Sequence, residues 1–259
     1  MQPFQFGIAH EPLYGVYHPP LRPSSQPAAV LLCPPIGHEY QQTHWAYKQL
    51  ANRLGKLGFP VLRFDYFGTG NASGDTAEGN IERWLKDIQL AGETLLKRSG
   101  ATRLITIGWR MGATLTVLAS HQQRPDIMIL WDPVISGQQY LSNLQALHHA
   151  KLEQMNRTKD FPPDRRPLDL MGYIFSDTLL NELNNLDLLT TSLHAPDTLT
   201  LLIDADNHQH QQWVEKLQQH GTPFTSNIIE DIPNWHHLKS MEAALLPNKT
   251  LNKITQQLK

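Results

Sequence analysis

The chain has little cysteine, little net charge and no long apolar run. Its single thiol, Cys33, excludes an internal disulfide and fits a reducing compartment. Residues 1–6 lack the charged start and apolar core of a signal peptide, and no apolar run approaches the roughly 18 residues of a membrane span. A formal net charge of -2 gives no electrostatic attraction to nucleic acid or to an anionic membrane. We therefore expect a cytoplasmic protein.

Strand-like and helix-like segments alternate along most of the chain. Apolar runs typical of buried strands lie at residues 28–33, 59–64, 103–107, 127–131 and 199–203, and a last strand is predicted at 225–230. Apolar residues at helical spacing lie at 43–57, 81–95, 111–121, 211–220 and 251–258. A hairpin is predicted for residues 4–17. This alternation predicts an α/β protein with a parallel, doubly wound sheet.

Residues 134–195 interrupt the alternation. They are rich in Gln, Asn and His and contain several helical stretches. We predict a core made of residues 1–133 and 196–259, with 134–195 as a helical lid over the carboxyl edge of the sheet.

An arginine occupies the centre of a glycine-framed pentapeptide, Gly108-Trp109-Arg110-Met111-Gly112. An apolar strand leads into it and a helical run leads out. In a G-x-S-x-G elbow, this strained strand-to-helix turn presents a nucleophilic serine. A guanidinium is a fixed cation and cannot attack as a nucleophile. The frame of the elbow is thus expected to persist without its usual chemistry.

Four segments in order carry a family resemblance: Cys33–Tyr40 (CPPIGHEY), Arg63–Gly70 (RFDYFGTG), the pentapeptide, and Leu130–Val134 (LWDPV). With them the chain resembles the α/β-hydrolase superfamily, and more narrowly its serine-aminopeptidase-like, S33-type branch. It is similar to bacterial hydrolases named as exosortase-system-associated, in which the elbow reads G-x-R-x-G. The resemblance implies an α/β-hydrolase fold with a mostly parallel sheet and a helical lid insertion.

The resemblance also implies where an oxyanion hole would lie. Its donors would be the amide of Met111 and one amide from Ile36 or Gly37. The Met111 amide would lie at a helix N-terminus, where the helix dipole favours an anion. His38 belongs to the same loop and is a candidate for contact with a ligand.

A buried guanidinium needs a partner, because leaving it unpaired costs several kcal/mol. Glu39 is the first candidate, since its loop lies beside the elbow, and Asp206 is the second. Two interpretations stay open at this stage. Arg110 could form an internal ion pair with Glu39, or it could bind an anionic ligand such as a carboxylate, a phosphate or an acyl-carrier group.

A base and an acid for catalysis also have candidates late in the chain. The resemblance places the base at His236 or His237 and the acid at Asp206, with Asp204 as the alternative. None of the other histidines has metal-ligand spacing in a suitable context, and His208 and His210 are expected on a solvated surface. No metal or cofactor is predicted.

Three functional hypotheses follow. The first is a protein without serine-based hydrolysis that binds an anionic or acyl-type small molecule, or a carrier-linked group, at the elbow. The second is an active hydrolase or acyltransferase in which the His–Asp pair activates substrate or water and Arg110 stabilises the oxyanion. The third is a non-catalytic interaction protein that uses its lid helices, and a homodimer is compatible with it.

Overall fold

The computed structural model describes residues 1–22, 27–156, 168–204, 206–229, 235 and 247–259. Its centre is an eight-stranded sheet in the order β1-β2-β4-β3-β5-β6-β9-β10. The strands are β1 (Gln2–Ile8), β2 (Glu11–His18), β3 (Ala28–Cys33), β4 (Val61–Asp65), β5 (Arg103–Trp109), β6 (Ile127–Trp131), β9 (Thr198–Ile203) and β10 (Thr225–Ile228). From β4 to β10 neighbouring strands are parallel, whereas β2 runs antiparallel to both β1 and β4. The predicted hairpin and the mostly parallel, doubly wound sheet are confirmed.

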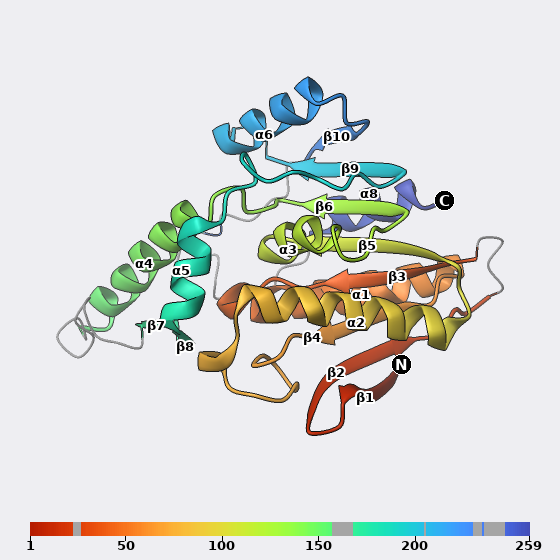
Figure 1. Cartoon of the computed structure of the whole chain (residues 1–259), viewed down its shortest axis with the longest axis horizontal. Helices are drawn as coiled ribbons and strands as arrows, with labels where there is room; N and C mark the ends of the chain where they lie inside the picture. The colour runs from red at the N-terminus through yellow and green to blue at the C-terminus, as the bar shows by residue number, and fades with distance from the viewer. Residues whose placement is uncertain (23–26, 157–167, 205, 230–234, 236–246) are drawn as a thin grey trace.

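Helices cover both faces of the sheet (Figure 1). One layer holds α1 (Gly37–Leu57) and α8 (Asn248–Gln257), and the other holds α2 (Ile81–Ser99), α3 (Met111–Ala119) and α6 (His208–Gln219). Side chains of a strand alternate between faces. In β3, Val30 and Leu32 therefore pack with α1 and α8, whereas Leu31 and Cys33 pack with α2 and α3. A strand that is buried on both faces explains the unbroken apolar run in the sequence.

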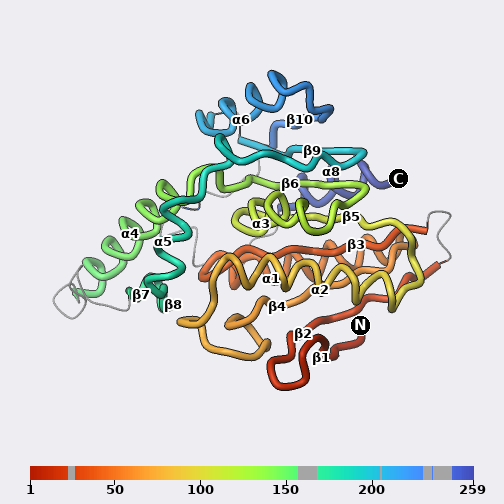
Figure 2. The backbone as a smooth tube through the Cα atoms, viewed as in Figure 1, coloured from red at the N-terminus to blue at the C-terminus, as the bar shows by residue number. Residues whose placement is uncertain are grey.

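The chain between β6 and β9 leaves the sheet at the carboxyl ends of the strands (Figures 1 and 2). It contains α4 (Gly137–Gln154), the hairpin β7 (Leu168–Leu170) and β8 (Tyr173–Phe175), and α5 (Asp177–Asn185). Ser136 and Ser176 cap α4 and α5 with their hydroxyls, which accept amides of the first turn. The insertion is thus mainly helical, with a small hairpin that the residue pattern did not predict.

Helix α1 begins earlier than predicted, at Gly37 rather than at residue 43. Gly37 has a φ of 58°, which lets the chain turn sharply from the loop after β3 into the helix. The first turn of α1 therefore carries His38 and Glu39. In the part of the chain that the structure describes, no helix is long and apolar enough to cross a membrane.

Candidate functional site

The elbow geometry is retained around Arg110. This residue lies between β5 and α3 with φ 52° and ψ -124°, a backbone conformation that is strained for a residue other than glycine. The two framing glycines allow the close packing. A Cβ on Gly108 would lie 2.5 Å from the Cα of Ala113, and a Cβ on Gly112 would lie 2.2 Å from the carbonyl oxygen of Pro34. Neither contact is sterically tolerable, so the strand, the helix and the loop after β3 meet only with glycine at both positions.

Two carboxylates hold the Arg110 guanidinium. Its Nη2 lies 3.1 Å from Oε1 of Glu39, and its Nε also donates to that oxygen, at 3.2 Å. On the other side, Nη1 donates to Oδ2 of Asp132 at 3.2 Å and to the Asp132 carbonyl oxygen at 3.3 Å. All three side chains are buried: Arg110 is 6%, Glu39 2% and Asp132 2% exposed. Burial lowers the pKa of Arg110, but Glu39 and then Asp132 outweigh it, and the net shift is upward.

Tryptophan side chains close the cluster. The guanidinium carbon of Arg110 lies 5.0 Å from the centre of the Trp235 ring, a cation–π distance. The Nε1 of Trp235 donates to Oδ2 of Asp132, and its ring meets Trp131 edge-on at 6.0 Å. Trp131 in turn packs edge-on against Trp109 at 4.3 Å. Arg110 therefore lies in an enclosed, internally paired cluster.

The contact between Arg110 and Asp132 follows from strand register. In the parallel pair β5 and β6, Trp109 lies opposite Trp131, so the residues that follow them emerge side by side at the carboxyl edge. Asp132 also has positive φ, 48°. Glu39, the first candidate partner, thus binds Arg110 together with Asp132, which the sequence did not suggest. No described contact joins Arg110 to Asp206, the alternative candidate. Register between the two apolar runs was the signal that could have found Asp132.

His210 extends the cluster from α6. It is 1% exposed, so the expected solvated position for it is wrong. Its Nε2 lies 3.0 Å from the Pro133 carbonyl oxygen and 3.4 Å from Oδ1 of Asp132. The carbonyl can only accept, so Nε2 carries the hydrogen. His210 thereby fixes the turn that holds Asp132.

Two further polar side chains lie buried in the electrostatic field of Arg110. They are His38, in the first turn of α1, and Tyr140, in α4 of the insertion, which are 7% and 5% exposed. Neither His38 Nε2 nor the Tyr140 hydroxyl has a hydrogen-bond partner within the described residues. Burial and then Arg110 lower the pKa of His38 to about 4, and burial and then Glu39 raise the pKa of Tyr140 well above its usual range. Both groups are therefore neutral near pH 7 and able to bind a polar neutral partner.

The loop that precedes α1 borders a small cavity of about 20 Å³. Ile36 and Gly37 line it from one side, and Tyr173 and Phe175 of the β7–β8 hairpin line it from the other. Its walls are mostly apolar. The insertion thus packs over Ile36 and Gly37, the segment in which the resemblance places one oxyanion donor. The other expected donor, Met111, is fully buried and is the first residue of α3.

Among the described residues, no contact joins Arg110 to Asp204 or Asp206, the candidates for the catalytic acid. Asp206 is exposed, and its amide donates to the Oδ1 of Asp204 at 3.0 Å. His236 and His237 lie outside the described residues. Their neighbour Trp235 is the one described residue of that segment, and it reaches the Arg110 cluster.

Comparison with known families agrees with this geometry. The model for serine aminopeptidase, S33, matches residues 26–208, from β3 to the start of α6. The chain belongs to the serine aminopeptidase S33 family. The S33 match spans the elbow, both carboxylates that bind Arg110, and the insertion. A search of curated proteins found no match.

Solved structures that resemble this S33 member are α/β hydrolases of low sequence identity. One is the α/β hydrolase GrgF from Penicillium, with a TM-score of 0.65, 12% identity, and coverage of 99% of this chain and 96% of that one. Another is Est1E from Butyrivibrio proteoclasticus, solved with ferulic acid bound. Its TM-score is 0.63 and its sequence identity is 13%, and the match covers 98% of this chain and 96% of that one. A third is an α/β serine hydrolase without a lid from Xanthomonas campestris. Its TM-score is 0.60 and its sequence identity is 15%, and the match covers 99% of this chain and 91% of that one. They share the fold with this chain.

Proposed function

We propose that this S33-family protein does not hydrolyse substrates through an acyl-serine step, and that it binds a small acyl-type molecule, or a carrier-linked acyl group, at the elbow. The observation that carries the proposal is the pairing of Arg110 with both Glu39 and Asp132. Arg110 has no nucleophilic atom and is held by a carboxylate on each side, so its role at this position is structural. It leaves ligand recognition to its neighbours.

The charges in the cluster favour a neutral acyl group over an anion. One guanidinium faces two carboxylates, so an additional negative group would meet net negative charge at short range. Neutral partners are supplied by the Tyr140 hydroxyl and the His38 imidazole, both buried and unpaired among the described residues. A hydroxyl can donate to an acyl carbonyl, and the apolar side chains of Tyr173 and Phe175 border the space for a short chain.

The insertion serves as a lid in this proposal. The β7–β8 hairpin lines the cavity with Tyr173 and Phe175, opposite Ile36 and Gly37 of the core. The proposal extends the binding space from this cavity to Tyr140 of α4, which is buried near Glu39 and Arg110. With a cavity of only about 20 Å³ in the structure, ligand entry requires the insertion to move away from Ile36 and Gly37.

The hydrolytic alternative has less support. It requires Arg110 to turn toward a developing oxyanion, but all of its nitrogens are engaged by Glu39 and Asp132. It also requires Asp206, or Asp204 in its place, to orient His236 or His237, and Asp206 is exposed to solvent.

Labelling and turnover test the loss of hydrolysis. A serine-directed fluorophosphonate should not label the protein, and p-nitrophenyl butyrate and short acyl thioesters should not turn over above the buffer rate. Labelling, or a turnover that His236→Ala or His237→Ala abolishes, would overturn this part of the proposal.

Calorimetry tests binding. The probe is the hexanoyl thioester of N-acetylcysteamine, and Tyr140→Phe should weaken its affinity about tenfold, the loss of one hydrogen bond worth about 1.4 kcal/mol. Tyr17→Phe is the matched control, because Tyr17 is equally buried but lies under Arg98. Equal affinity of the two variants would contradict a role for Tyr140.

A further inference from the structure

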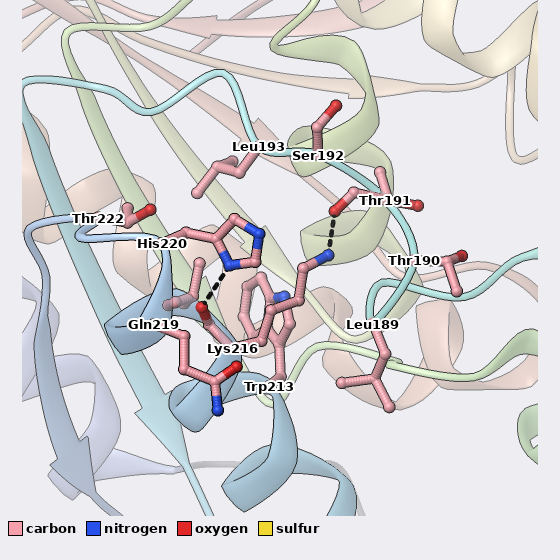
Figure 3. Close-up of a pocket in the computed structure, with 11 residues that line it drawn as sticks. Leu189, Thr190, Thr191, Ser192, Leu193, Trp213, Lys216, Gln219, His220 and Thr222 are labelled. Carbon is pink, nitrogen blue, oxygen red and sulfur yellow. Dashed lines mark hydrogen bonds between the residues drawn. The ribbon is translucent and has the colours of Figure 1, made fainter.

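A second pocket lies away from the elbow, between α6 and the segment of residues 189–193 that connects α5 to β9 (Figure 3). Its volume of about 650 Å³ is within the range of small-molecule sites. Trp213 and Leu217, both buried, form its apolar floor. Thr191, Ser192, Gln219 and Thr222 contribute neutral polar groups. None of the lining residues belongs to the Arg110 cluster.

Lys216 gives this pocket its charge. Its ammonium donates to the carbonyl oxygens of Leu188, at 3.0 Å, and Thr191, at 2.5 Å. These neutral acceptors fix the position of the cation without neutralising it, and an ammonium has a third hydrogen to donate. Among the described residues, no carboxylate lies within ion-pair distance of Lys216, and none lines the pocket.

His220 adds a directed hydrogen-bonding group. Its Nδ1 lies 2.9 Å from the Lys216 carbonyl oxygen, which can only accept, so Nδ1 carries the hydrogen. In the neutral ring, Nε2 is then an acceptor. Figure 3 shows the imidazole beside Lys216, between α6 and the segment that carries Leu193. The pocket thus combines one positioned positive charge, neutral polar groups and an apolar floor.

We propose that this pocket binds a small organic monocarboxylate with an apolar body. The carboxylate would meet the third hydrogen of Lys216, and the body would lie against Trp213 and Leu193. A single cation matches a single negative charge, which favours a carboxylate over a phosphate dianion.

A fluorine NMR titration with 4-fluorobenzoate tests the proposal, with 4-fluorobenzamide as the uncharged control. The benzoate should bind at least tenfold more tightly than the amide, and Lys216→Met should abolish the difference. Because Lys216→Met also removes two hydrogen bonds to the loop, Gln219→Glu provides a second variant that leaves them in place. It adds a negative charge at the pocket and should weaken benzoate binding several-fold, whereas Gln218→Glu, on the same helix but outside the pocket, should not.

Equal binding of benzoate and benzamide, or no binding of either, would overturn the proposal. So would unchanged affinity in both Lys216→Met and Gln219→Glu. Competition by inorganic phosphate as strong as that by unlabelled benzoate would overturn the assignment to a carboxylate. Tyr140→Phe, at the elbow, should leave the titration unchanged, and a loss of binding there would place the probe at the wrong site.

Discussion

Removing the Arg110 guanidinium should destabilise the protein strongly at neutral pH. In Arg110→Met the side-chain volume is largely kept, but Glu39 and Asp132 lose the cation that lies 3.1–3.2 Å from them. Breaking a buried ion pair by removing one partner costs about 3–5 kcal/mol, because the remaining charge stays buried. For a chain of this size, that corresponds to a fall in Tm of roughly 6–20 °C. The strained backbone at position 110 is common to both proteins and cancels in the comparison.

Urea unfolding followed by tryptophan fluorescence and circular dichroism measures this cost. The difference between Arg110→Met and the wild-type protein should shrink as pH falls from 7.5 to 5, since protonation relieves the two uncompensated carboxylates. Combining Arg110→Met with Glu39→Gln and Asp132→Asn should recover most of the lost stability, because the triple variant buries no net charge.

Arg103→Met is the matched control. Arg103 also contacts two carboxylates, Asp126 at 3.2 Å and Asp197 at 3.8 Å, but its side chain is 42% exposed. Exposed pairs contribute at most about 1 kcal/mol. If Arg110→Met cost no more than Arg103→Met at pH 7.5, Arg110 would not be the centre of a closed ion-pair cluster, and the structural role assigned to it would be refuted.

Three other predictions concern the same region. Burial, and then Arg110, lower the pKa of His38 from 6.5 to about 4, so the native state resists its protonation. The contribution of His38 to stability is therefore complete above pH 6.5 and is lost as pH falls toward 4, by about 3 kcal/mol. His38→Gln should flatten this part of a pH–stability curve, and an unchanged slope would contradict the shift. Gly112→Ala should destabilise by about 1–3 kcal/mol, since its methyl group would lie 2.2 Å from the Pro34 carbonyl oxygen; Gly55→Ala, in ordinary contact inside α1, should stabilise by about 0.5–1 kcal/mol in the same melts. Arg110→Ser should show no esterase activity, because the new hydroxyl would face two carboxylates where an oxyanion must form; measurable turnover of p-nitrophenyl butyrate would refute that reasoning.

The fold was predictable because its strands are buried on both faces. A parallel strand such as β3 or β6 needs apolar residues at every position, and the apolar runs at 28–33 and 127–131 match the observed bounds. The glycine-framed elbow was recognisable for a related reason. Its spacing is imposed by close contacts at Gly108 and Gly112 that leave no room for a Cβ without a shift of the neighbouring backbone.

The site was less predictable, because the residues buried there are polar. The first turn of α1 was missed since His38 and Glu39 face the elbow, where helical spacing of apolar residues does not apply. Glu39 as the partner of Arg110 could be inferred, because its loop follows the strand next to β5. The positions of Asp132 and Tyr140 could not be predicted in this way. The position of Asp132 depends on strand register and that of Tyr140 on the path of the insertion, and both arise from tertiary contacts rather than from a local sequence pattern.

The presence of two carboxylates around one guanidinium has an electrostatic reason. Arg110 is the N-cap residue of α3, where the helix dipole contributes a partial positive charge that favours anions and disfavours a cation. A single carboxylate would balance the guanidinium but not the helix terminus. Asp132 supplies the second negative charge, and its own position is held by the indole of Trp235 and by His210. Arg110 at this elbow is therefore tied to at least three other residues, and the cluster is expected to behave as one cooperative unit rather than as a set of independent side chains.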